Sequence, residues 1–320
     1  VRNAHGMKVV MALDLSGILI CTRCGAPLPP EKSWARTGIR CTSCGAEVPV
    51  IRGIPRFVST DAYTASFSFE WNRYGRTQLD DATSRESEET FRAKTGLSPE
   101  EVAGRLVLDV GCGMGRFADV VSRWGGRVIG IDLSLAVEAA HANLSDRDNI
   151  RILQADLFHL PFRPGTFDIV YSLGVLHHTP DCEKAFRQLV PFVRRGGWLC
   201  VWVYAHLGPW VRVAHAYRRM TVRMPRRFLH ALCRLAIPWY HVCRLPLIAP
   251  LLFTLLPISM HPNPEWRILD TFDLYSPTHR SLHTFPEVYR WFTSEGFEDI
   301  RLLDVPVALS GRRLSPGERP

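Results

Sequence analysis

A short apolar strand that runs directly into a glycine-rich turn is the feature that most limits how this chain can fold. Residues 105–110 form the strand pattern, Gly111, Gly113 and Gly115 follow at once, and an amphipathic helix begins after them. Glycine lets the backbone turn tightly and approach a ligand, while the start of the helix offers unpaired N–H groups. This order predicts a nucleotide-type site on a parallel α/β sheet.

The spacing of the glycines disfavours a dinucleotide cofactor and hydride chemistry. A dinucleotide fingerprint needs a glycine at position 116, where this chain has Arg116. A second strand over 127–131 ends at Asp132, about 20 residues after the loop, where a carboxylate can accept hydrogen bonds from both hydroxyls of a ribose. The pattern is therefore compatible with a ligand that contains ribose, but it disfavours NAD.

Two further strands are expected to end in polar residues at the same edge. The strand over 150–154 leads into Asp156 and Leu157, and the strand over 167–171 leads into Ser172 and a later pair, His177 and His178. The carboxyl ends of parallel strands meet at one edge of a sheet, so these residues should lie together. The plain alternative for any one aspartate is that it only caps the next helix.

In this order the motifs resemble the class I S-adenosylmethionine-dependent methyltransferases of the type 11 kind, with V-L-D-x-G-C-G-x-G-R and F-D-x-V-x-S-x-x-V-L-H-H. The resemblance is dense over 102–204, and residues 67–74 and 285–297 resemble zinc-ribbon-fused members. It implies a doubly wound, mostly parallel seven-stranded sheet and S-adenosylmethionine as cofactor. It also implies these cofactor-binding residues: Asp109, Gly111, Cys112, Gly113, Gly115, Asp132, Leu133, Asp156, Leu157 and Ser172.

Four cysteines near the start of the chain predict a structural zinc site. Cys21 and Cys24 form one C-x-x-C turn and Cys41 and Cys44 a second, each followed by glycine, which is the spacing of a zinc ribbon. A module of about 45 residues buries too little apolar surface to fold alone, whereas zinc can stabilise it. A redox dithiol, an iron–sulfur site, a catalytic zinc and a docking role on RNA or protein stay open as alternatives.

The nine cysteines are odd in number and do not resemble a secreted disulfide framework. No export signal is visible, and the most apolar run, 245–260, is shorter than the roughly 20 residues that span a bilayer. We therefore expect a cytoplasmic protein. Contact with an anionic membrane through residues 209–260 is the one peripheral option that the composition suggests.

The net charge of +8 is concentrated in one segment. Residues 184–264 contain no Asp or Glu, but one lysine and eleven arginines. Residues 209–224 are expected to form an amphipathic helix that starts at Pro209. Its apolar side should carry Trp210, Val213, Ala214, Tyr217, Met220, Thr221 and Met224. We expect a helical cap over the substrate mouth that favours an anionic, apolar or membrane-anchored substrate; a lid with its arginines in water is the plain alternative.

Methyl transfer from a sulfonium is an in-line displacement, so it depends mainly on positioning. Orientation can supply ~7–11 kcal/mol of barrier lowering. A general base typically supplies a 10²- to 10⁴-fold rate increase, which is only ~3–5 kcal/mol. His178 and His283 are the chosen catalytic candidates. The wider set of possible bases also contains His177, Asp273, Tyr275 and His279.

The expected organisation has five parts: a zinc ribbon (14–58), an N-terminal helical segment (59–100), the methyltransferase core (101–204), the cap (205–283) and a C-terminal part of the core (284–313). The methyltransferase core is expected to contain a fifth strand over 198–204. In the last part, a helix is expected over 285–295 and strands near 300–304 and 306–310.

The function predicted from these features is methyl transfer to a small-molecule, glycan or lipid-linked acceptor. One alternative is an rRNA or tRNA methyltransferase whose ribbon grips RNA. The nearly balanced charge of the first 100 residues disfavours it, because RNA binding relies on basic residues. A second alternative is a non-catalytic cofactor-binding scaffold, which the complete set of strand-end motifs argues against.

Overall fold

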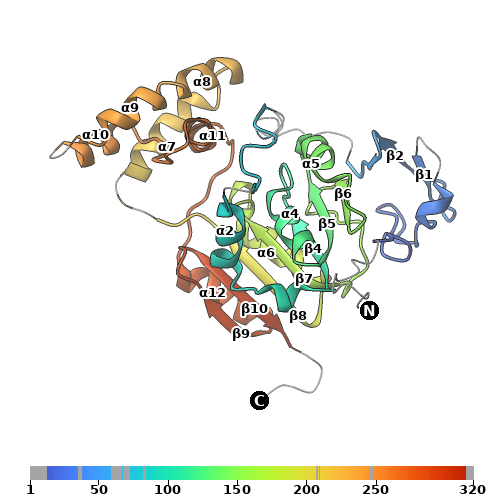
Figure 1. The fold of residues 1–320 in the computed structure, drawn as a ribbon. Coiled ribbons are helices and arrows are strands. Elements are labelled where there is room, and N and C mark those ends of the chain that lie inside the picture. The colour runs from blue at the N-terminus through green and yellow to red at the C-terminus, as the bar shows by residue number, and fades with distance from the viewer. Residues whose placement is uncertain are drawn as a thin grey trace, which may run out of the picture.

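The computed structural model describes residues 13–34, 38–58, 67, 73–81, 84–206, 208, 210–245 and 248–314. Its centre is a seven-stranded sheet in the order β6-β5-β4-β7-β8-β10-β9 (Figure 1). The strands are β4 (Leu106–Val110), β5 (Arg127–Asp132), β6 (Ile150–Gln154), β7 (Phe167–Leu173), β8 (Val193–Trp202), β9 (Phe297–Leu302) and β10 (Ala308–Arg313).

The first strand of this sheet, β4, lies in its middle. The chain then adds β5 and β6 toward one edge and crosses back to β7 on the other side of β4. Strands β4 to β8 are parallel, and β10 runs antiparallel to both β8 and β9. The order therefore reverses between β4 and β7, where open α/β sheets bind their ligands. The predicted doubly wound, mostly parallel sheet is confirmed.

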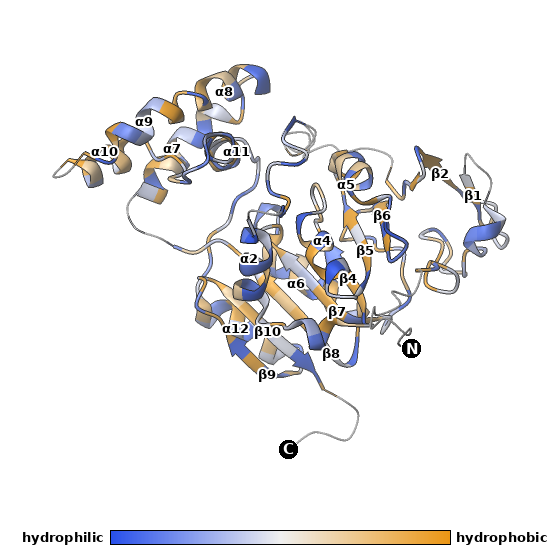
Figure 2. Ribbon diagram, in the orientation of Figure 1, coloured by the Kyte–Doolittle hydropathy of each residue, from blue (hydrophilic) through white to orange (hydrophobic). Residues whose placement is uncertain are grey.

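Alternate strand residues bury against opposite layers of helices. Leu106, Leu108 and Val110 face a layer with α6 (Cys182–Leu189) and α12 (Phe285–Ser294). Val107 faces the other layer, formed by α2 (Glu86–Thr95), α3 (Pro99–Val102), α4 (Arg116–Arg123) and α5 (Ala136–Leu144). The central strands are accordingly hydrophobic along their length (Figure 2), as expected for a sheet buried on both faces.

Three predicted strand boundaries shift in the structure. The strand expected over 198–204 already begins at Val193, because Val193 pairs with Phe167 and Trp198 with Ile169, so the residues between them bulge out. The last two strands lie at 297–302 and 308–313 instead of near 300–304 and 306–310. Their pairing with each other and with β8 sets these boundaries, which a single apolar run does not reveal.

The N-terminal residues form a small ribbon beside β6 (Figure 1). Its antiparallel strands are β1 (Gly38–Arg40), β2 (Glu47–Ile51) and β3 (Ile54–Pro55), with the short helix η1 (Glu31–Ser33) between the two cysteine pairs. Backbone bonds join it to the core: Ile20 N–H donates to the Pro161 carbonyl at 2.9 Å, and Phe57 N–H to that of Gln154 at 2.8 Å.

The ribbon also covers a part of the sheet that lacks a helix. The connection from β6 to β7, residues 155–166, is fully described and contains no helix, although parallel strands are usually joined by one. Leu160 and Phe162 of this connection instead share one buried core with Leu13, Leu15 and Leu19. The ribbon therefore supplies apolar cover that a crossover helix would otherwise give.

Between β8 and α12 lies the cap, five helices at the upper left of Figure 1. They are α7 (Trp210–Thr221), α8 (Arg226–Cys233), α9 (Ala236–Val242), α10 (Ala249–Leu255) and α11 (Pro264–Tyr275). Helices α7, α8 and α9 pack on α11, and α10 packs on α7. Within the described part of the chain, no helix combines the length and the apolarity needed to cross a membrane.

The prediction of which residues form the apolar side of α7, the first cap helix, is partly wrong. Tyr217 and Met220 are exposed, and the buried face carries Val211, Ala214 and Arg218. Arg218 turns inward because its Nη1 donates to the Pro277 carbonyl just beyond α11, at 3.2 Å. Residues 59–66 and 68–72 of the expected N-terminal helical segment, and Pro209, lie outside the described residues.

Candidate active site

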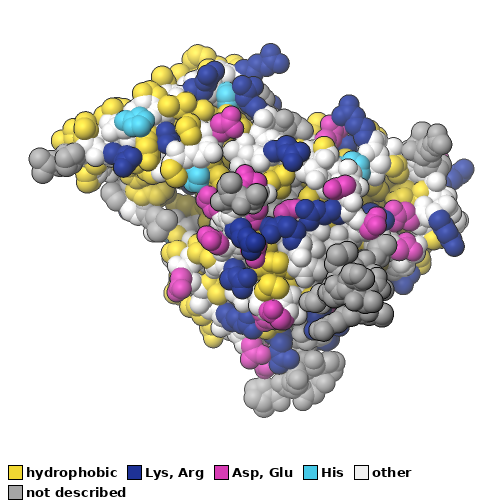
Figure 3. Space-filling model, in the orientation of Figure 1, with side chains coloured by type: hydrophobic (Ala, Val, Ile, Leu, Met, Phe, Trp, Pro, Cys, Tyr) yellow, Lys and Arg dark blue, Asp and Glu magenta, His cyan; other side chains and the backbone are white. Residues whose placement is uncertain are grey.

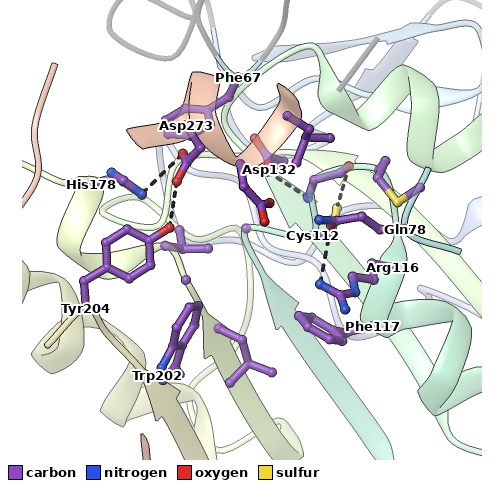
Figure 4. A pocket seen from close by; sticks show the side chains of 18 of the residues that line it. Phe67, Gln78, Cys112, Arg116, Phe117, Asp132, His178, Trp202, Tyr204 and Asp273 are labelled. Carbon is purple, nitrogen blue, oxygen red and sulfur yellow. Dashed lines mark hydrogen bonds and ion pairs between the residues drawn. The ribbon is translucent and has the colours of Figure 1, made fainter. Parts of the chain in front are cut away.

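A cavity of about 540 Å³ lies at the carboxyl edge of β4 to β8, between the sheet and α11 (Figure 4). The glycine loop and the ends of β5 and β6 form one wall. Helices α2 and α11 and the end of β8 form the other. The site thus joins residues that are far apart in the sequence.

Seven of the residues expected to bind the cofactor line this cavity: Gly111, Cys112, Gly113, Asp132, Leu133, Asp156 and Leu157. Glycine is required at position 111, because its φ is +80° and a Cβ there would lie 2.3 Å from Cγ2 of Val175. Burial raises the pKa of the Cys112 thiol well above its usual value, so Cys112 is a packing residue and not a thiolate.

The carboxylate of Asp132 keeps an acceptor position open toward the cavity. Its Oδ2 accepts from Gly113 N–H at 3.0 Å, and its Oδ1 accepts from the N–H and Oγ–H of Ser134 at 2.8 and 2.7 Å. A carboxylate offers about four acceptor positions. One therefore remains for a ligand hydroxyl, which is what a ribose would provide.

Asp109, Gly115 and Ser172 lie outside the described lining, behind the loop. Asp109 is buried, its Oδ2 has no hydrogen-bond partner among the described residues, and burial raises its pKa to about 8. Ser172 Oγ donates to the Val110 carbonyl at 3.1 Å, and a Cβ at Gly115 would strike Leu144. These three residues support the loop, and their contact with the cofactor stays a prediction.

His178, Tyr204 and Asp273 form a polar network on the opposite wall (Figure 4). The Tyr204 hydroxyl donates to Asp273 Oδ2 at 2.7 Å, and His178 Nε2 lies 3.8 Å from Asp273 Oδ1. His178 Nδ1 contacts the His279 carbonyl at 3.0 Å; since a carbonyl only accepts, Nδ1 carries the proton. Burial lowers the pKa of His178, so Nε2 of the neutral ring is free to accept a proton.

The other predicted bases lie elsewhere. His283 is buried before α12, with Nδ1 2.8 Å from Glu287 Oε1 and Nε2 2.7 Å from Ser281 Oγ, so it serves the start of that helix. His177 is buried against the Tyr204 ring, and burial lowers its pKa far below the usual value. Tyr275 donates to the Pro257 carbonyl at 2.7 Å. The choice of His283 as a catalytic residue stays a prediction, and His283 is not among the described residues that line the cavity.

Several lining residues were missed by the sequence analysis. Lys94 Nζ lies 3.2 Å from the centre of the Trp202 ring, and burial, reinforced by the nearby Arg116, lowers its pKa to about 7. Arg116 lies over the Trp266 ring at 4.8 Å. Asp270 has its pKa raised to about 6 by burial. Only Arg116 carried a signal, as the residue that follows the glycine motif.

The four ribbon cysteines lie as a tetrahedral zinc site requires. The Sγ atoms of Cys21 and Cys44 are 3.6 Å apart, those of Cys24 and Cys41 are 3.7 Å apart, and all four lie within 4.8 Å of one another. Zinc–sulfur bonds of about 2.3 Å give a tetrahedral edge of about 3.8 Å. The donor set fits zinc, and no described residue of the ribbon lines the cavity.

Comparison with known proteins agrees with this geometry. Residues 108–201 match a family model described as a methyltransferase domain. Over 102 residues, the chain is 39% identical to a ubiquinone biosynthesis O-methyltransferase of Albidiferax ferrireducens, covering 31% of this chain and 40% of that protein. Over 123 residues, it is 32% identical to a demethylmenaquinone methyltransferase of Thermobifida fusca, covering 38% and 52%. The chain thus spans about half or less of these relatives.

Among solved structures, a magnesium protoporphyrin IX methyltransferase of Synechocystis is 17% identical, with a TM-score of 0.47, and the match covers 79% of this chain and 97% of that one. The fold assignment here comes from the strand order and the matched domain.

Proposed function

We propose that this chain, in which residues 108–201 form an S-adenosylmethionine-dependent methyltransferase domain, methylates a small, largely apolar acceptor held between the sheet and the cap. The observation that carries the proposal is the cavity with two different walls. One wall has the glycine loop and the carboxylates at the ends of β5 and β6; the other has aromatic rings and the His178–Asp273 pair.

The first wall suits the donor molecule. Asp132, with its open acceptor position, would hold the ribose, the loop at Gly111 and Gly113 would hold the methionine part, and Asp156 with Leu157 the adenine. S-adenosylmethionine bound there would supply an electrophilic methyl group. The sheet edge would orient it, and orientation is worth ~7–11 kcal/mol in well-aligned reactions.

The second wall suits the acceptor. Trp202, Trp210 and Trp266 line it, and such rings favour apolar or ring-shaped molecules. The names of the relatives mention ubiquinone, demethylmenaquinone, tocopherol and sterol, all bulky and apolar. We infer an acceptor of that character, free or lipid-linked, whose leaving proton would pass to His178 Nε2 beside Asp273.

Calorimetry with S-adenosylmethionine and its demethylated product tests the donor wall. Wild type should bind both, and Asp132→Asn should bind at least tenfold more weakly, about 1.4 kcal/mol. Asp146→Asn, at an exposed aspartate between α5 and β6, is the matched control. Absence of binding to either molecule by folded wild type would overturn the proposal.

Transfer of a labelled methyl group to a cell extract tests the acceptor wall. The label should enter the organic-soluble fraction and depend on Asp273. Label recovered only in nucleic acid would contradict the small-molecule acceptor and favour an RNA methyltransferase. Donor binding without transfer to any fraction would favour a non-catalytic scaffold.

A further inference from the structure

The outer surface of the cap is unusually apolar. Met220, Leu235 and Leu251 are 64%, 60% and 63% exposed. Most of the large hydrophobic side chains that are exposed among the described residues belong to this segment, residues 217–260. Scattered apolar residues are normal on a surface, but a concentration of them marks a contact surface. We call the exposed side chains of residues 217–260 the cap patch.

The cap patch is not an unfilled part of the cap's own core. That core is complete around Phe272, with Ala214, Leu229 and Cys233 packed against α11. Helix α10, with the sequence Ala-Pro-Leu-Leu-Phe-Thr-Leu, has no buried residue at all, although it is fully described. Leaving Leu251 and Leu255 of this helix exposed to water forgoes roughly 1.5–3 kcal/mol for each side chain that could be buried.

Arginines accompany the apolar side chains. Arg212, Arg219 and Arg223 recur at spacings of seven and four on α7 and just after it, which places them on one side of the helix, next to the side with Tyr217 and Met220. A groove of about 640 Å³ on this basic side is lined by His206, Arg212, His215 and Arg219, and no acidic residue is among its described lining. In Figure 3 the cap shows yellow and dark blue side chains interleaved.

The charge of the surface selects its partner. Because residues 184–264 contain no acidic residue, two copies of the patch would bring like charges together, which disfavours self-association. Nucleic acid would satisfy the arginines but not the exposed leucines. A surface that offers both phosphates and an apolar layer satisfies both.

We infer that the cap patch docks on an anionic lipid bilayer, with its apolar side chains at the acyl boundary and its arginines on lipid phosphates. An amphipathic surface of this kind lies in the interface and does not span it. The inference rests on the proposed function in one respect: an apolar acceptor would then enter the cavity from the lipid. Each arginine near an anionic surface contributes about 1 kcal/mol.

Vesicle flotation with the full chain tests the docking. Wild type should float with vesicles of phosphatidylcholine and phosphatidylglycerol in equal parts, and poorly with phosphatidylcholine alone. The double variant Arg219→Gln, Arg223→Gln should lose about 30-fold in partitioning, as two such contributions imply. Leu251→Ser with Leu255→Ser should lose at least tenfold with an unchanged melting temperature, since α10 buries none of its residues.

Matched controls lie away from the cap. Leu302→Ser removes an exposed leucine of β9, and Arg163→Gln removes an exposed arginine between β6 and β7; both should float as wild type does. Equal partitioning of all proteins, or binding that ignores lipid charge, would overturn the inference. So would a dimer in light scattering that the Leu251→Ser, Leu255→Ser variant abolishes. Donor binding is measured separately by calorimetry without vesicles, so its failure would strike the proposed function alone.

Discussion

The ribbon and the cap are both additions to one sheet, yet they are attached in different ways. The ribbon shares a buried core with β6 and the helix-free connection after it, and no described residue of it lines the cavity. The cap has a core of its own around Phe272 and contributes Trp266, Asp270 and Asp273 to the cavity wall. We therefore expect the ribbon to serve stability and, under the proposed function, the cap to serve the choice of acceptor.

The largest expected effect is on the ribbon. Cys24→Ser removes one of the four predicted zinc ligands, the most exposed of these cysteines, so little packing is lost. We expect bound zinc to fall from one atom per chain to none. The unfolding free energy in urea should fall by several kcal/mol, because structural zinc contributes ~10–16 kcal/mol to isolated modules and the sheet face beside β6 would lose its cover.

Cys243→Ala, at a buried cysteine of the cap, should leave the zinc content unchanged. Cys24→Ser could instead slow methyl transfer without lowering the free energy of unfolding. The ribbon would then belong to the active site, and the contrast drawn between ribbon and cap would be wrong.

On the cap side, Asp273→Asn should reduce kcat roughly 100- to 1,000-fold, in the range typical of acid–base residues. The asparagine oxygen can still accept from Tyr204, so donor affinity and melting temperature should not change. Glu265→Gln, an exposed residue of the same helix, is the control. A fall in stability as large as the fall in rate would show that Asp273 holds the cap in place and takes no part in the reaction.

The pH dependence of kcat/KM tests the cavity wall that carries His178 and Asp273. Burial lowers the pKa of His178, and the neutral ring accepts the proton, so kcat/KM depends on the form present above that pKa. It should therefore be constant above the pKa of His178 and fall tenfold per pH unit below it. His178→Gln should remove this limb, whereas His241→Gln, exposed on α9, should keep it. A limb unchanged in His178→Gln would assign it to Asp270, whose pKa is about 6.

The smallest expected effect is at the edge of the ribbon. Arg52 pairs with Glu138 of α5 at 2.7 Å, but its side chain is 74% exposed. Exposed ion pairs contribute about 0–1 kcal/mol, so Arg52→Ala should shift the urea midpoint only slightly. A loss above about 2 kcal/mol would show that surface charge, and not the shared core, holds the ribbon.

The core of the fold was predictable because its signals are local. Each of β4 to β7 is a short apolar run that ends in glycine or a polar residue, and Gly111 has a conformation that other residues strain to adopt. The four cysteines were equally clear from their spacing. The cofactor wall of the cavity followed from the same strand ends.

The acceptor wall was only partly predictable, because its residues meet through packing. Asp273 and His178 were among the candidates, but Lys94 and Trp202 resemble ordinary residues of a surface helix and a strand until α2 and β8 meet. The inward position of Arg218 was not predicted, since nothing in the local sequence indicates the Pro277 carbonyl to which it donates. His283 looked catalytic because Glu287 and Ser281 are recognised as its partners only in three dimensions.

One contact ties the cap to residues 73–81, a strap that passes beside the glycine loop. The Tyr74 hydroxyl lies 2.6 Å from His230 Nε2 of the cap, and Asn143 Nδ2 bridges the carbonyls of Gly75 and Met114. If the cap moved away from the sheet, either the contact between Tyr74 and His230 would break or the strap of residues 73–81 would move with the cap. Asn143 joins this strap to the glycine loop, so a chain of hydrogen bonds connects the cap to the cavity wall that carries the loop.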